Sequence, residues 1–526
     1  MYDILSKNGH VVDGTGNPWF KADIAIVGGK IVKIGRGLQG EAKTIIDASG
    51  RIVSPGFIDA HTHSDFNVLA DPLCQSTIQQ GVTTQVVGNC GSSPGPRAEG
   101  DEKNLGRLAA FPWLKPEWTT LGEYIDHVNK VGVATNVVPL VGFGTVRNVV
   151  MGPLERPATP EECAKMRVLV AEAIDEGAFG MSTGLFYAPQ CFAPTEEVIE
   201  VAKALKPKEA LYVTHPRDES DYTIGYGAAI QEGIDIARAA GVAVQISHLH
   251  ALGVATWKRA PEYVEIMQKA RDQGIDVTAD QYPYAASAGG ITGSVIPRWA
   301  LDGGREKMLE RLADKATRDK IAKEVAIAFK RRGGVERHTI ATYLPNPAFE
   351  GLTVDKVAEI LGEPPEYAVL TMLEKGDSSW VSKIIDEEDI VTFIKAPWVM
   401  GGSDGSSLAL TGPVSGGKPH PRNFGTFPRW IGTYGRDMGL FRVEEIVRKL
   451  TSLPAQRFGL KERGLLKEGF WADVVVFDWH TIKDTATWDR PHQFPEGIDY
   501  VFVNGELVVD HKKHTGKLAG KALRKQ

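Results

Sequence analysis

The chain has 526 residues, of which 42% are hydrophobic and 24% are charged. This composition is ordinary for a globular protein with one large domain and a smaller companion. The formal net charge of -6 leaves no basic excess for displacing counterions from phosphates, which argues against a sequence-independent nucleic-acid binder. The sequence has no apolar run of bilayer length, and it does not open with a basic segment followed by an apolar one. A cytoplasmic location is expected.

Both ends of the chain have the pattern of short antiparallel strands. Alternating apolar residues punctuated by glycine fill the segments 3–5, 10–14, 22–29, 30–35 and 42–48. Near the carboxyl end, 472–478 is a buried-strand run, and 500–509 is a hairpin with an Asn504-Gly505 turn. We predict one small β-sandwich domain, formed from residues 1–54 plus 460–526.

The middle of the chain alternates between helices and buried strands. Thr159, Pro160 and Glu162 make a helix start with a capping box, and Gly177 ends that helix before a short apolar run. Similar alternation gives eight candidate parallel strands, at 52–58, 84–87, 136–141, 178–182, 211–214, 242–247, 275–279 and 398–402. We predict an α/β fold, a (β/α)8 TIM-like barrel over residues 55–459, with a doubly wound open sheet as the alternative. The long gap before the last strand predicts an inserted subdomain near the barrel mouth, at residues 285–345.

The first strand of the predicted barrel ends in a pair of histidines. His61 and His63 lie two residues apart in the segment GFIDAHTHSD, residues 56–65. Residues at this spacing in a strand point to the same face, and two imidazoles on one face suit a divalent metal such as zinc. Alone, the pair is equally compatible with two ordinary histidines beside a loop.

Further metal-competent side chains follow other predicted strands. Cys90 comes after the second, His215 after the fifth, His248 after the sixth and Asp404 after the eighth. Reactive groups of (β/α)8 enzymes collect at the carboxyl ends of the strands, because the following loops build that face. The sequence therefore predicts a metal site there.

These motifs resemble those of the amidohydrolase superfamily. Many members carry a carboxylated lysine after strand four, but the matching stretch here, residues 180–185, has no lysine. The segment NCGSSP at 89–94 instead resembles the D-aminoacylase (N-acyl-D-amino-acid deacylase) branch, in which a cysteine thiolate binds the metal. Further stretches resemble the same branch over nearly the whole chain: TGLFYAP at 183–189, THPRDE at 214–219, DQYPY at 280–284 and HPRNFGTFPR at 420–429.

The resemblance implies a tightly held zinc ion on Cys90, His215 and His248. It implies a second, weaker site on His61, His63 and Asp404, and it leaves open a bridging role for Cys90. A thiolate and two imidazoles bind zinc strongly and leave a fourth position for water. Asp404 is the candidate general base and acid.

The resemblance also implies substrate contacts. Arg422 would hold the carboxylate of the product amino acid, and either Tyr282 or Tyr284 would donate its hydroxyl. Where the family often has a lysine, this chain has His250, which still offers a hydrogen bond. The predicted reaction is deacylation of an N-acyl-D-amino acid, with a cyclic amide hydrolase (hydantoinase or dihydroorotase-like) or a D-dipeptidase as alternatives and a non-catalytic scaffold as a remote one.

The expected partner is a small-molecule N-acyl amino acid or related amide. Neither a nucleic acid nor a membrane is expected, and a homo-oligomer is left open. Substrate side chain, acyl group and stereochemistry do not follow from the residues alone.

Overall fold

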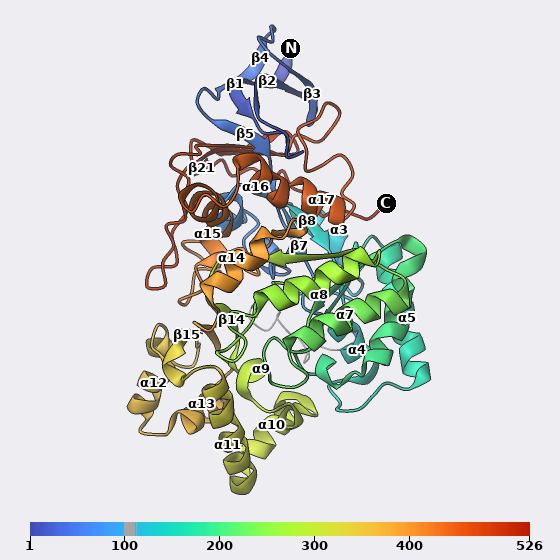
Figure 1. The fold of residues 1–526 in the computed structure, drawn as a ribbon, viewed down its shortest axis with the longest axis vertical. Helices are drawn as coiled ribbons and strands as arrows, with labels where there is room; N and C mark the ends of the chain where they lie inside the picture. Colours follow the sequence, from blue (N-terminus) through green and yellow to red (C-terminus); the bar gives the residue numbers. More distant parts are fainter. Residues whose placement is uncertain (99–110, 112) are drawn as a thin grey trace.

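The computed structural model describes residues 1–98, 111 and 113–526. Figure 1 shows three parts along the long axis: a β-rich part that contains the amino terminus, a central α/β part, and a helical part at the opposite end. In the described part of the chain, no helix is both long enough and apolar enough to cross a bilayer.

The central part is a barrel of parallel strands, as predicted. Its strands are β6 (Phe57–Asp59), β7 (Val82–Val87), β8 (Asn136–Pro139) continued by β9 (Val141–Gly142), β10 (Gly180–Gly184), β11 (Leu211–His215), β12 (Val244–Ile246), β13 (Val277–Gln281) and β17 (Val399–Gly401). Every pairing between them is parallel. The ring closes where Ala60 N donates to Gly401 O at 3.3 Å and Thr62 bridges to Gly405.

The predicted first strand, 52–58, is in fact two strands of different sheets. β5 (Ile52–Pro55) pairs with β1 and β18 of the terminal sheet, whereas β6 pairs with β7 of the barrel. Gly56 separates them, and a Cβ built on it would meet the Thr83 side chain at 2.2–2.7 Å. Only glycine lets the chain pass this close to the neighbouring strand as it leaves one sheet for the other.

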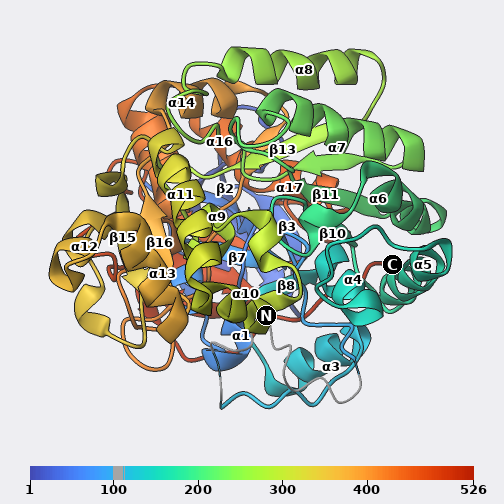
Figure 2. The ribbon, with the colours of Figure 1, turned by 90° about the horizontal axis from the view of Figure 1, so that it is seen from below.

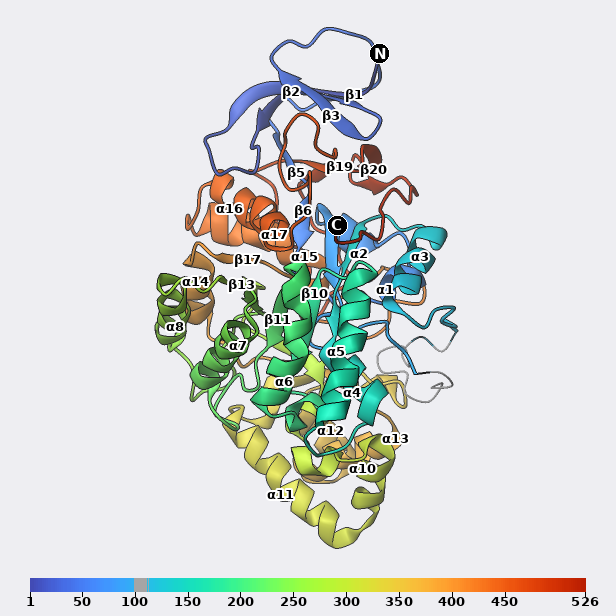
Figure 3. The same ribbon diagram turned by 90° about the vertical axis from the view of Figure 1, so that its right-hand side faces the viewer.

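Helices cover the outside of the barrel (Figure 3). They include α3 (Leu121–Val131), α4 (Phe143–Met151), α5 (Pro160–Asp175), α6 (Thr195–Ala202), α7 (Tyr226–Ala240), α8 (Ala260–Asp272), α14 (Glu387–Lys395), α16 (Val443–Leu450) and α17 (Ser452–Arg457). The short helices α1 (Asn67–Ala70), α2 (Gln75–Ile78) and α15 (Arg422–Arg429) lie in loops. The predicted capping box of α5 is present, since Thr159 and Glu162 each accept from the other's backbone N–H.

A subdomain is inserted between β13 and α14. It contains β14 (Ser287–Gly290), α9 (Ile291–Val295), α10 (Gly304–Ala313), α11 (Lys315–Arg331), β15 (His338–Thr342), α12 (Val354–Leu361), α13 (Pro365–Lys375) and β16 (Ser379–Ser382). The predicted end at residue 345 is too early, because β16 is the central strand that pairs with both β14 and β15. The subdomain has its own core, which includes Phe329 and Trp380. Figure 2 shows its helices across one end of the barrel.

The two chain ends form one sheet of nine strands. They are β1 (Tyr2–Val11), β2 (Phe20–Val27), β3 (Lys30–Gly35), β4 (Ala42–Asp47) and β5, joined to β18 (Val474–Phe477), β19 (Ile498–Val503), β20 (Glu506–Asp510) and β21 (Lys513–His514). One core takes residues from both halves, such as Ile24 and Val476. The sandwich is thus a single continuous sheet folded over its own core. Asn504 and Gly505 both have positive φ, as a tight hairpin turn requires.

Candidate metal centre

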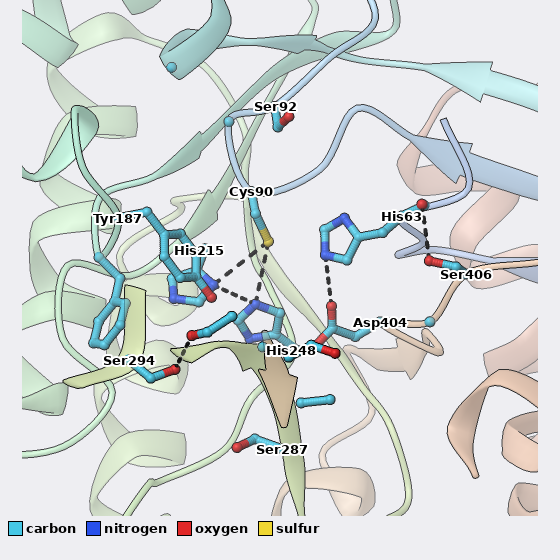
Figure 4. A pocket seen from close by; sticks show the side chains of 18 of the residues that line it. His63, Cys90, Ser92, Tyr187, His215, His248, Ser287, Ser294, Asp404 and Ser406 are labelled. Atoms are coloured by element: carbon cyan, nitrogen blue, oxygen red, sulfur yellow. Dashed lines mark hydrogen bonds and ion pairs between the residues drawn. The ribbon is translucent and has the colours of Figure 1, made fainter. Parts of the chain in front are cut away.

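All six predicted metal ligands lie at the carboxyl ends of barrel strands. They are His61 and His63 after β6, Cys90 after β7, His215 at the end of β11, His248 after β12 and Asp404 after β17. Figure 4 shows His63, Cys90, His215, His248 and Asp404 turned toward a common space. Segments more than 300 residues apart in the sequence therefore meet at one point.

Three of these residues have a left-handed backbone, which is uncommon away from glycine. Their φ angles are 53° at Cys90, 32° at His248 and 48° at Asp404. Neighbouring groups hold two of them in place: His248 N donates to the Asp280 carboxylate at 2.7 Å, and Asp404 N donates to His61 O at 2.8 Å. Backbone strain of this kind concentrates at functional sites, where surrounding contacts maintain it.

The Cys90 sulfur is the centre of the donor cluster. Sγ lies 3.4 Å from His61 Nε2, 3.7 Å from His215 Nδ1 and 3.6 Å from His248 Nε2. The two imidazole nitrogens of His215 and His248 are 2.7 Å apart. A tetrahedral zinc ion with ordinary bond lengths separates sulfur and nitrogen ligands by about 3.6 Å and two nitrogen ligands by about 3.3 Å. The sulfur–nitrogen distances therefore fit zinc, and the two imidazoles would move slightly apart to hold it.

The surrounding charges favour the thiolate form of Cys90. Burial alone would raise the pKa of the thiol, but His61, His63, His215 and His248 together hold it well below its usual value. The thiolate is the form of cysteine that binds metal.

Asp404 forms a second group of contacts beside the sulfur. Its Oδ1 lies 2.9 Å from His63 Nε2 and 3.5 Å from His61 Nε2, and its Oδ2 lies 2.8 Å from Arg422 Nη1. Burial opposes the charge of the carboxyl, yet Arg422 and the histidines hold the pKa of Asp404 well below its usual range. Asp404 is therefore an ionised carboxylate that touches both the metal-competent histidines and a cation.

Glu219 is a functional residue that the sequence reasoning did not assign. Its carboxylate lies 3.4 Å from His215 Nε2, 3.3 Å from His248 Nδ1 and 2.7 Å from His250 Nε2. These contacts occupy the outer nitrogens of His215 and His248 and turn the inner ones toward Cys90. The second ring nitrogen of a metal-binding histidine usually has a partner of this kind, which is a carboxylate, a backbone carbonyl or water. The sequence signal for this role was the position of the carboxylate, four residues after His215 in the same loop.

Asp280 orients the imidazole of His61 in the same way as Glu219 orients the two other histidines. Its Oδ1 lies 3.2 Å from His61 Nδ1 and its Oδ2 accepts from Gln245 Nε2 at 2.7 Å. It is fully buried at the end of β13. The carboxylate therefore fixes the His61 ring with Nε2 directed at the Cys90 sulfur.

The predicted substrate-binding residues take different positions. Arg422 lines the cavity beside Asp404, with its guanidinium 4.8 Å from the centre of the buried Tyr282 ring. His250 has both ring nitrogens engaged, by Glu219 and by the Tyr282 hydroxyl at 2.9 Å. Tyr284 turns away from the ligand cluster, because its hydroxyl donates to Asp484 at 3.3 Å.

A cavity of about 890 Å³ opens directly onto the donor cluster. The barrel loops contribute His63, Cys90, His215, His248 and Asp404 to its wall. The inserted subdomain contributes Ser287, Ser294, Arg332 and Trp380. The space is large enough for a small organic ligand, and two structural units build it together.

Comparison with known proteins agrees with this architecture. Residues 44–509 match the family model described as "Amidohydrolase family". The chain belongs to the amidohydrolase family. It is 36% identical over 532 residues to the D-aminoacylase of Alcaligenes xylosoxydans xylosoxydans, covering 99% of this chain and 97% of the relative. An N-acyl-D-aspartate deacylase from the same organism is 33% identical, with 99% of this chain and 95% of the relative covered.

A solved structure is similar over the full length of this amidohydrolase. It is an N-acyl-D-glutamate deacylase from Bordetella bronchiseptica, complexed with zinc and a phosphonate inhibitor that mimics the tetrahedral intermediate of the reaction. The TM-score is 0.85 at 31% identity, and the match covers 99% of each chain. The (β/α)8 barrel with its terminal sheet is thus the fold of this family member.

Proposed function

We propose that this amidohydrolase is a zinc-dependent deacylase that converts N-acyl-D-amino acids to a carboxylate and a free D-amino acid. The observation that carries the proposal is the convergence of one thiolate, the imidazoles and one carboxylate at the mouth of the barrel. The relatives named above act on N-acylated D-amino acids, which supports the substrate class. All four cysteines are free, in keeping with the cytoplasmic location that we propose.

Cys90, His215 and His248 would hold the zinc ion. Their donor atoms approach one another from three strands, and Glu219 supports both histidines from behind. His61, His63 and Asp404 would bind a second, weaker ion, with Cys90 within reach of both positions. When bound, zinc lowers the pKa of a water molecule and polarises the carbonyl of the scissile amide.

Asp404 is placed to move the proton. Its carboxylate is ionised and faces the cavity between His63 and Arg422. It would take a proton from the attacking water and deliver it to the nitrogen of the leaving amine. The ion pair with Arg422 keeps it in the basic form that the first transfer needs.

Arg422 is the cation we assign to the α-carboxylate of the substrate. It is buried and lines the cavity. A guanidinium has five N–H donors in a planar fork, so it can contact a substrate carboxylate while paired with Asp404. His250, whose ring nitrogens are already engaged, is assigned a supporting role for Glu219 and Tyr282.

The test is a metal analysis followed by a chiral substrate screen. The purified protein is expected to contain zinc and to release amines from N-acetyl-D-amino acids far faster than from the L-enantiomers. Hydantoins and dihydroorotate are included to test the ring-opening alternative. A zinc-loaded protein that cleaves cyclic amides but no N-acyl-D-amino acid would overturn the proposal.

A further inference from the structure

Four arginines in the described part of the chain are buried: Arg147, Arg332, Arg422 and Arg463. Three of them pair with a carboxylate, namely Arg147 with Glu197, Arg422 with Asp404 and Arg463 with Asp473. Arg332 alone among these four has no carboxylate of a described residue within 4.0 Å. Its exposed fraction is 3%. It is a buried cation with no counter-ion among the residues that the structure describes.

The contacts of Arg332 are weak ones. The residue follows helix α11 directly, and its Nη2 donates to Ser294 O across 3.4 Å. The guanidinium lies 5.5 Å from the centre of the Tyr222 ring and 5.8 Å from that of Trp380. Its Nε is buried without any hydrogen-bond partner among the described residues.

This arrangement is costly for the protein alone. A buried charge is normally paired, because burial removes the stabilisation that water provides. Contacts with aromatic faces offset only part of that cost. Since Arg332 lines the same cavity as Cys90, His215 and Asp404, an anionic ligand in the cavity can supply the missing partner.

Arg332 and Arg422 lie on different sides of the metal ligands. Arg422 contacts Asp404. Arg332 reaches the cluster from the other direction, through Tyr222 and Phe186 to His215, with ring-centre separations of 6.3 Å and 5.7 Å. Figure 4 shows Ser294, whose carbonyl oxygen accepts from Arg332, near Tyr187 and His215. Asp404 lies on the opposite side of His248 in the same view.

We propose that Arg332 binds a second carboxylate of the substrate, remote from the scissile amide. The inference rests on the proposed deacylase activity. With the α-carboxylate at Arg422 and the amide at the metal ligands, the acyl group extends toward His215 and Arg332. The placement therefore favours an acyl group that ends in a carboxylate, such as succinyl. An acidic side chain of the amino acid is the other part of the substrate that can supply this carboxylate.

The experiment uses substrates matched for size and different in charge. N-succinyl-D-leucine is compared with N-butyryl-D-leucine, and N-acetyl-D-glutamate with N-acetyl-D-glutamine. Arg332→Gln is expected to lower kcat/KM by about 10- to 100-fold for a charged member, mainly through KM, and by less than about twofold for its neutral counterpart. A lower kcat/KM on the succinyl substrate shows that Arg332 binds a carboxylate of the acyl group. A lower kcat/KM on the glutamate substrate shows that it binds a carboxylate of the amino-acid side chain.

Arg331→Gln is the matched control. Arg331 is the exposed neighbour of Arg332, so its removal changes the net charge equally and should leave all four rates unchanged. Arg332→Lys, which keeps the cation, is expected to retain part of the preference and provides a second test if the glutamine variant does not fold. Equal rate losses on charged and neutral members would overturn the role of Arg332. A wild-type enzyme that cleaves none of the four substrates would contradict the deacylase activity itself.

Discussion

Replacing Glu219 by glutamine tests whether this carboxylate prepares the histidines for metal. The carboxylate contacts the outer nitrogens of His215 and His248 at 3.4 Å and 3.3 Å and that of His250 at 2.7 Å. Burial opposes its charge, but His215 and His250 hold the pKa of Glu219 well below its usual value. Glutamine has nearly the same shape but no charge, so it cannot replace the charged contacts with the three imidazoles.

The expected loss of zinc affinity in Glu219→Gln depends on the two metal-binding histidines that the Glu219 carboxylate contacts. Loss of a carboxylate partner behind a metal-binding histidine weakens metal affinity by about 10- to 100-fold, or about 1.4 to 2.7 kcal/mol. Because one carboxylate serves both His215 and His248, we expect Glu219→Gln to lie near the upper end of that range. Catalysis at saturating zinc should be reduced much less.

The assay is competition for zinc between the protein and a chelator of known affinity. Glu197→Gln is the control, because Glu197 is equally buried but pairs with Arg147 away from the cavity. It should reduce stability and leave zinc affinity unchanged. If Glu219→Gln binds zinc within about twofold of the wild type, the orienting role of Glu219 is refuted.

Three further predictions concern the metal, the proton transfer and stability. Cys90→Ser is expected to lose the tightly bound zinc on dialysis, and one zinc per chain after dialysis would contradict the thiolate site. Asp404→Asn should lower kcat by about 100- to 10,000-fold with the first zinc retained, whereas full activity at unchanged zinc content would exclude its role. Burial lowers the pKa of Lys449 from 10.5 to about 7. Between those values only the unfolded chain binds the proton, so the free energy of unfolding should rise from pH 7 to 10. Urea titrations should show that the free energy of unfolding rises less with pH in Lys449→Met than in the wild type. An equal rise in the two proteins would contradict the lowered pKa of Lys449.

Much of the site could be predicted because its ligands follow the order of the strands. Each of Cys90, His215 and Asp404 comes directly after an apolar run, and the carboxyl ends of barrel strands share one face. The capping box at Thr159 was predictable for a similar reason, since it depends on residues three positions apart.

Contacts made by side chains of separate loops were not predictable in this way. Glu219 contacts three histidines from two loops, and its position four residues after His215 gave only a weak local signal for that role. His250 lines the cavity, where the sequence predicted a substrate contact, but the engagement of both its ring nitrogens by Glu219 and Tyr282 was not predictable. Tyr282 and Tyr284 are two residues apart, yet they contact different partners, His250 and Asp484.

The boundaries between units depend on pairing that the local pattern does not contain. Residues 52–58 form one apolar run, but the close approach of Thr83 to Gly56 divides it between two sheets. The inserted subdomain continues past residue 345 because β16 supplies its central strand. Sequence periodicity indicates that a strand exists, and only tertiary contacts decide which sheet it joins.

X-ray absorption spectroscopy of the protein loaded with one equivalent of zinc tests the central claim most directly. The structure predicts one sulfur ligand at about 2.3 Å together with imidazole nitrogens at about 2.0–2.1 Å, and loss of the sulfur signal in Cys90→Ser. A wild-type spectrum with only nitrogen and oxygen ligands would contradict the claim that Cys90, His215 and His248 hold the metal.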